Sequence, residues 1–127
     1  MRLEDEIVKL FDQWNDALET GDPDAVVKLY AERAILEPTV SNRVRHNREE
    51  IRDYFVHFLA RGPSGKIDES NVRIYGGLAI NSGCYTFRFK NGPVEQACAR
   101  FTFVYQWIDG EWLIVEHHSS LMPEGAE

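Results

Sequence analysis

Hydrophobic residues near the start of the chain recur at helical spacing. Over residues 3–20 the apolar positions are three or four apart, which places them on one face of a helix. They are Leu3, Ile7, Leu10, Phe11, Trp14 and Leu18. Gly21 can adopt a positive φ and predicts the end of this helix. Asp22 and Pro23 then predict the cap and first turn of a short second helix.

The next segments combine a short strand with a third helix. Residues 34–37 are predicted to be a strand that ends at Pro38. Asn47, followed three residues later by Glu50, resembles a capping box and predicts the start of a third helix. Its buried face is predicted to contain Ile51, Tyr54, Phe55, Phe58 and Leu59. Gly62-Pro63 is expected to end the helix, and Ser64-Gly65 to extend the loop.

From about residue 67 the hydrophobic period changes from 3.6 to 2. Strands are expected at 67–75, 78–90, 94–108 and 111–119, with turns at Asn91-Gly92 and Asp109-Gly110. Helices followed by an antiparallel meander predict an α+β fold in one domain over residues 1–127. A long, curved sheet wrapped over three helices is expected to enclose a cavity, where small ligands usually bind.

A two-residue turn at Asp109-Gly110 pairs Trp107 with Trp112, and the period of two then assigns the faces. One face is predicted to carry Phe101, Phe103, Tyr105, Trp107, Trp112, Ile114, Glu116 and His118. The opposite face is predicted to carry Thr102, Val104, Gln106, Ile108, Leu113, Val115, His117 and Ser119. Both faces are largely apolar, and only one is needed to cover the helices. The second face therefore predicts a partner subunit, most simply a homodimer.

Three polar residues on the predicted strands are candidates for catalysis or ligand binding. Glu116 and His118 share a predicted face, and a carboxylate can orient an imidazole for proton transfer. The alternatives are a structural buried pair or a solvated strand end. Arg88 lies among aromatic residues and could anchor an anionic ligand or extend into solvent. His117 is interpreted as a hydrogen-bonded residue in or beside the subunit interface.

Aromatic residues on the helices and strands supply a candidate ligand pocket. Most aromatic residues of this kind belong to the core, although the polar tips of Trp and Tyr can also serve a pocket. The predicted pocket residues are Trp14, Tyr30, Tyr54, Phe58, Arg88, Phe103 and Tyr105.

Composition narrows the classes of partner. A formal net charge of −7 disfavours nucleic acid as a partner, because phosphate backbones are repelled. No apolar run approaches the length of a membrane span, and the N-terminus carries acids where a signal peptide needs a basic start. We therefore expect a cytoplasmic protein that binds no membrane, and we expect Cys84 and Cys98 to be thiols. No metal site and no cofactor are predicted, since metal-ligand spacings and cofactor motifs are missing from the sequence.

Four segments carry a family resemblance and together span most of the chain: TGDPDAVVKLYAERAILEP, NREEIRDYFVHFL, CYTFRF and DGEWLIVEHHSSLMP. They resemble the nuclear transport factor 2-like superfamily, which includes SnoaL-like cyclases and ketosteroid isomerases. Within it, the chain is most similar to the calcium/calmodulin-dependent protein kinase II association domain family and its stand-alone bacterial relatives. The resemblance implies a cone-like α+β barrel, self-association through the sheet and a deep pocket at the mouth of the cone. In the kinase domain that pocket contains arginines. Arg88 matches one of them, whereas Phe103 and Ser119 stand at the positions matching others.

Two functions from different classes follow. The first is a self-associating domain, a homodimer or a larger ring, with a hydrophobic pocket for a small molecule and no kinase. The second is a cofactor-independent isomerase, cyclase or hydratase, in which Glu116 or His118 would move protons and Arg88 would hold an anionic oxygen. A purely structural hub is a third reading.

Overall fold

The computed structural model describes residues 2–124. Its elements in chain order are α1 (Leu3–Glu19), α2 (Pro23–Val27), β1 (Tyr30–Glu37), α3 (Arg48–Leu59), β2 (Pro63–Tyr75), β3 (Leu78–Phe89), β4 (Gln96–Ile108) and β5 (Glu111–Leu121). The predicted α+β class is confirmed. No helix within the described residues combines the length and the hydropathy of a membrane span.

The helix starts follow from local side-chain chemistry. Asp22 caps α2 by accepting a hydrogen bond from the N–H of Asp24 at 3.0 Å. Asn47 caps α3 by accepting from the N–H of Glu50 at 2.9 Å. The predicted capping box is half formed, because the Glu50 carboxylate accepts from the backbone N–H of His46 and not from that of Asn47.

Two strands begin earlier than the sequence predicts. β1 starts at Tyr30, which was expected to be the end of the second helix, and β2 starts at Pro63, which was expected to be loop. Pro63 is tolerated because it is the first residue of a strand at the sheet edge, where its missing N–H leaves little unpaired. The N–H of Gly65 donates to the side chain of Asn15 at 2.7 Å, which ties the start of β2 to α1.

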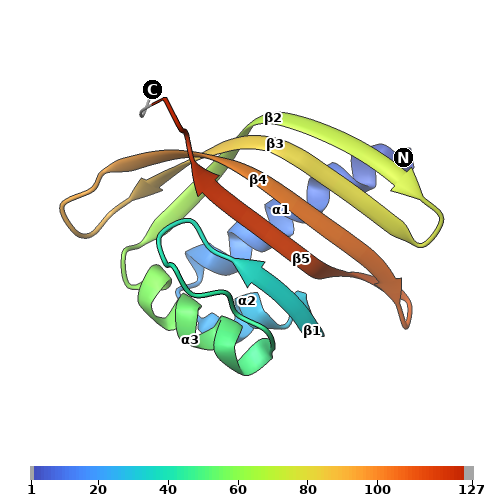
Figure 1. The fold of residues 1–127 in the computed structure, drawn as a ribbon, viewed down its shortest axis with the longest axis horizontal. Coiled ribbons are helices and arrows are strands. Elements are labelled where there is room, and N and C mark those ends of the chain that lie inside the picture. Colours follow the sequence, from blue (N-terminus) through green and yellow to red (C-terminus); the bar gives the residue numbers. More distant parts are fainter. Residues whose placement is uncertain (1, 125–127) are drawn as a thin grey trace.

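The five strands form one mixed sheet in the order β1-β5-β4-β3-β2, with β1 parallel to β5 and the other pairs antiparallel. The sheet curves over the three helices, which all lie on one side of it (Figure 1). We call the side facing the helices the inner face and the opposite side the outer face. The inner face and the helices enclose an aromatic core in which Trp14, Tyr30, Tyr85, Phe55 and Phe103 are almost completely buried.

A β-bulge in β5 corrects the predicted assignment of faces. Tyr105 pairs with Ile114, but the next residue of β4, Val104, pairs with Glu116, so Val115 is an extra residue. Beyond Val115 the strand is shifted by one position, which exchanges its two faces. His117 therefore lies opposite Phe103 on the inner face, whereas Glu116 and His118 lie on the outer face. The predicted positions of Glu116, His117, His118 and Ser119 were wrong for this reason.

β2 contains a second bulge, and close to it β2 packs tightly against Gly83 of β3. The register shifts between Ile67 and Glu69, so Asp68 is the extra residue. A Cβ atom added to Gly83 would lie 2.0 Å from the carbonyl oxygen of Glu69, which is too close for any real contact. Only glycine fits here without movement of the backbone.

We expect Gly83→Ala to lower the free energy of unfolding by about 2–3 kcal/mol, because the added methyl group must push the two strands apart. Gly77→Ala is the matched control, since no atom lies within 4 Å of its added Cβ and its φ is not positive. Urea unfolding followed by circular dichroism measures both. Equal stability of the two variants would contradict this packing.

Candidate functional site

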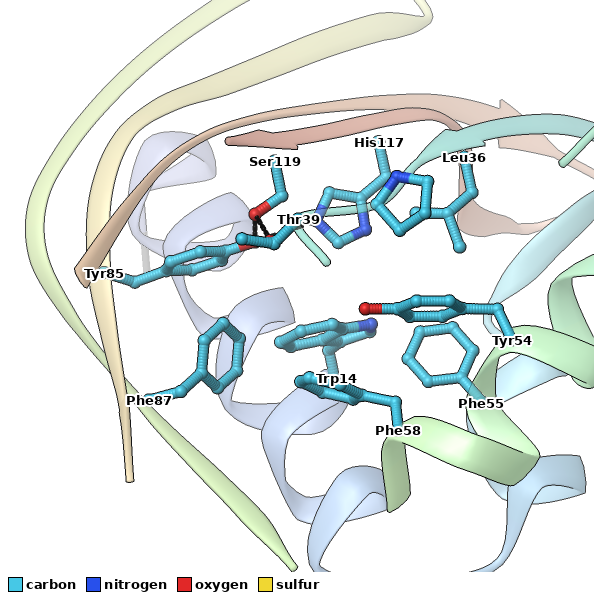
Figure 2. Close-up of a pocket in the computed structure, with 11 residues that line it drawn as sticks. Trp14, Leu36, Thr39, Tyr54, Phe55, Phe58, Tyr85, Phe87, His117 and Ser119 are labelled. Carbon is cyan, nitrogen blue, oxygen red and sulfur yellow. Dashed lines mark hydrogen bonds between the residues drawn. The ribbon is translucent and has the colours of Figure 1, made fainter. Parts of the chain in front are cut away.

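The inner face holds a buried chain of hydrogen bonds centred on His117. Figure 2 shows His117 and the end of this chain at Ser119. His117 is 3% exposed. Its Nδ1 lies 2.9 Å from the hydroxyl of Tyr30, and its Nε2 lies 3.2 Å from the hydroxyl of Tyr85. Tyr30 also accepts a hydrogen bond from the indole N–H of Trp14 at 3.1 Å. One imidazole thus joins β5 to β1 and β3 and, through Tyr30, to α1.

The other end of the chain passes through hydroxyl groups. Tyr85 donates to Ser119 Oγ at 2.7 Å, and Ser119 is hydrogen-bonded to Thr39. Because the Tyr85 proton goes to Ser119, Tyr85 can accept from an Nε2–H of His117, and Tyr30 can donate to Nδ1. Every polar group is then satisfied by a neutral His117 that carries its proton on Nε2.

Burial holds His117 in this neutral state. Removal from water lowers the pKa of His117 to about 3, and the nearby His118 adds to the fall. Aromatic rings enclose the imidazole: Phe103 stacks on it with centroids 4.0 Å apart, and Trp14 meets it edge-on at 5.4 Å. Burial also raises the pKa of Tyr30 and of Tyr85. The network therefore contains no charged group at neutral pH.

A narrow cavity lies beside this network, between β5, β3 and α3. Its polar lining consists of Thr39, Tyr54, Tyr85, His117 and Ser119. Its apolar lining consists of Trp14, Leu36, Pro38, Phe55, Phe58 and Phe87. The volume open to the centre of a water-sized sphere is about 10 Å³, which is the space of one water. A larger molecule could enter only if the lining side chains moved.

Tyr54 contributes the least satisfied polar group of this cavity. Its side chain is 8% exposed, and its hydroxyl points into the cavity (Figure 2). No hydrogen-bond partner for that hydroxyl exists among residues 2–124, while burial raises its pKa and keeps it protonated. The guanidinium of Arg45 lies over the Tyr54 ring, 5.3 Å from its centroid. Tyr54 therefore offers a free hydrogen-bond donor at the centre of an uncharged cavity.

The predicted pocket residues are only partly brought together. Trp14, Tyr54 and Phe58 line the cavity. Tyr30 and Phe103 support it from behind, through the hydrogen bond and the stacking on His117. Tyr105 is buried farther along β4, and its hydroxyl has no partner within the described part of the chain. Arg88 does not face the cavity: its strand neighbours Phe87 and Phe89 point inward, so Arg88 is exposed on the outer face.

Under the enzyme hypothesis, Glu116 and His118 were the candidates for an acid–base pair, and the sequence left open which face of the sheet they occupy. They lie on the outer face, where Glu116 is paired with Val104 and His118 with Thr102. Glu116 meets a second carboxyl, that of Glu37 on β1. Partial burial raises the pKa of Glu116 to about 7, and the hydrogen bond and negative charge of Glu37 add to the rise. The positions of Glu116, His118 and Arg88 do not support a shared proton-transfer site.

The sequence did not identify Thr39, Tyr85 or Ser119 as site residues. Thr39 reaches the cavity because the loop after β1 folds back, with Leu36 and Arg45 exchanging two backbone hydrogen bonds at 2.9 Å. Ser119 turns inward only because of the bulge at Val115. The regular alternation of Tyr85, Phe87 and Phe89 was the one local signal that could have placed Tyr85 on the inner face.

The buried neutral His117 makes folding sensitive to acid. The unfolded chain protonates a histidine near pH 6.5, whereas the folded state keeps His117 neutral down to about pH 3. The unfolded state therefore binds more protons in this window, and stability falls as the pH drops through it, by up to about 1.4 kcal/mol per pH unit. In His117→Gln the free energy of unfolding should depend less steeply on pH, by about 1 kcal/mol per pH unit.

Urea unfolding at about pH 7, 5.5 and 4.5, at constant protein concentration, measures this slope. His57→Gln is the control, because His57 is exposed on α3 and its replacement should leave the slope unchanged. If His117→Gln keeps the full slope of the original protein, the imidazole is not held neutral in the core.

Comparison with known proteins identifies the chain at the level of family and fold. Residues 3–123 match the family model of the calcium/calmodulin dependent protein kinase II association domain. No curated protein matches the chain in sequence. A provisionally assigned association domain of this kind from Xanthomonas campestris is 50% identical, with a TM-score of 0.90 over 94% of this chain and 88% of that one.

More distant structures share the fold. A provisionally assigned dehydratase of the NTF2-like family from Streptomyces avermitilis is 16% identical, with a TM-score of 0.83 over 94% of this chain and 95% of that one. A provisionally assigned ketosteroid isomerase from Parabacteroides distasonis is 18% identical, with a TM-score of 0.78 over 96% and 89% of the two chains. The fold is therefore NTF2-like, and the chain belongs to the calcium/calmodulin dependent protein kinase II association domain family.

Proposed function

We propose that the protein is a self-associating module whose outer sheet face binds a second copy of the chain. The observation that carries this proposal is the uncovered apolar part of the outer face. Ile35, Ile80, Val104, Ile108 and Leu113 lie there half-buried, and within residues 2–124 all helices pack on the other side (Figure 1). Membership of an association-domain family supports the same conclusion.

The dimensions of the face suit such an interface. A stable interface buries roughly 800 Å² per partner, which is about a tenth of the 7339 Å² of accessible surface of this chain. Five strands make a face roughly 20–25 Å wide. Polar side chains such as Thr102, Gln106 and Ser120 are interspersed with the apolar ones, as in interfaces between subunits that are also soluble alone.

Replacing Val104 with lysine tests the module directly, because Val104 lies in a central strand of the outer face. The original protein should sediment as a dimer or a larger ring, and Val104→Lys should weaken association by about 100-fold or more through burial of an unpaired charge. Val56→Lys is the matched control, since Val56 is 42% exposed on α3. A monomeric original protein at high concentration in sedimentation velocity would overturn the proposal.

A second function, binding of a small uncharged molecule in the inner cavity, is favoured by one specific observation. The Tyr54 hydroxyl faces the cavity and makes no hydrogen bond within the described residues, and the cavity lining holds no charge. A polar group of this kind is normally satisfied by water or a ligand. A carboxylate or phosphate would have to leave water without a counterion, so we infer that the occupant is neutral and carries a hydrogen-bond acceptor.

Phenol and benzoate distinguish a neutral occupant from a charged one, because they share a ring and differ in charge. Phenol enters only when the lining side chains move aside, and by binding this opened form of the folded state it should raise the melting temperature through mass action, while benzoate should not. Tyr54→Phe should reduce the phenol effect several-fold in apparent affinity, and Tyr75→Phe should not, since Tyr75 is 63% exposed. Stabilisation by benzoate equal to that by phenol would show that the cavity is not selective for neutral ligands.

A further inference from the structure

The outer face carries an unpaired group of each sign. Glu37 and Glu116 bring two carboxyls together on β1 and β5, and no lysine or arginine among residues 2–124 forms an ion pair with either. Arg100, on β4, is exposed and likewise lacks an ion-pair partner within these residues. Both groups point away from the helices.

These opposite charges cannot meet within one chain. Arg100 pairs across the strands with Ser120, whereas Glu116 pairs with Val104, four residues farther along β4. Four residues of a strand span about 13 Å, which exceeds the reach of an ion pair. The row between Arg100 and Glu116 contains Thr102 and His118, and Glu37 on β1 is in register with His118 while its carboxyl is hydrogen-bonded to that of Glu116. The face therefore has an acidic region and a basic region separated by a polar row.

The acidic region is poorly satisfied in the single chain. Glu116 is half-buried, its pKa is raised, and the neighbouring ionisable group that adds to this rise within residues 2–124 is another carboxyl, that of Glu37. A solvated strand end would not show these features. A shallow hollow extends from Arg100 to the Thr102–His118 row and also contains the hydroxyl-bearing residues Ser82 and Ser120. The hollow offers several hydrogen-bond donors to an incoming carboxylate.

We propose that the second copy of the chain supplies the missing counterions: Arg100 of each protomer pairs with Glu37 and Glu116 of the other. A two-fold axis lying in the interface and passing near the Thr102–His118 row places each acidic region on the partner's basic region, and forms the contact twice. This inference rests on the proposed self-association and deepens it, because it fixes which outer-face residues meet and where the axis runs.

Charge reversal with rescue tests the pairing. Arg100→Glu places like charges opposite each other at two symmetric sites, and should weaken dimerisation by about 100-fold. Adding Glu116→Arg to that variant restores an opposite charge across the interface, and should recover about 10-fold of the loss. Equilibrium sedimentation gives the dissociation constants, and circular dichroism confirms that each variant is folded.

Two controls separate pairing from net charge. Arg100→Glu with Glu111→Arg changes the same number of charges, but Glu111 lies at the far end of β5 and should not rescue. Lys9→Glu reverses an exposed charge on α1 and should leave dimerisation unchanged. The pairing is supported if Glu116→Arg restores the dimerisation of Arg100→Glu and Glu111→Arg does not. Equal rescue by Glu111→Arg, or no effect of Arg100→Glu, overturns it while leaving self-association intact, whereas a monomeric original protein overturns the proposed function itself.

Discussion

The extra residue at Val115 is the constraint on which the rest of the structure depends. It shifts the second half of β5 by one position relative to β4, so that His117 and Ser119 face the helices. Without that shift, Glu116 and His118 would occupy the aromatic core, where a carboxylate has no partner and is strongly unfavourable. One bulge thus decides which polar groups are inside the molecule and which are on its outer face.

On the inner face, the bulge produces an interior that is polar but uncharged. His117 uses both ring nitrogens, and the two tyrosines beside it come from different strands. The network therefore joins α1, β1, β3 and β5 without an ion pair, which avoids the desolvation of two charges. The same geometry leaves Tyr54 with an unused donor and leaves room for about one water. Neutral chemistry follows from the packing and not from any motif.

Helices, caps and turns were predictable because their signals are local. The spacing of apolar residues located α1 and α3, Asn47 located the start of α3, and Asp109-Gly110 located the last hairpin. Alternation also grouped Phe101, Phe103 and Tyr105 of β4 on one face, and all three are buried on the inner face. The bulge at Val115 was not predictable, because Leu113 to His118 alternates no more clearly in one register than in the other. Arg88, Glu116 and His118 were misplaced with respect to the cavity because their positions depend on register or on long-range packing.

On the outer face, the same bulge explains why polar groups remain on a surface that is otherwise suited to apolar association. A purely apolar face would bind any similar surface and would favour non-specific contacts. Separated charges of opposite sign add little net affinity once desolvated, but they penalise wrong registers and wrong partners by placing like charges together. Glu116, with the Glu37 carboxyl beside it, lies on one side of the polar row and Arg100 lies on the other, which suits this role.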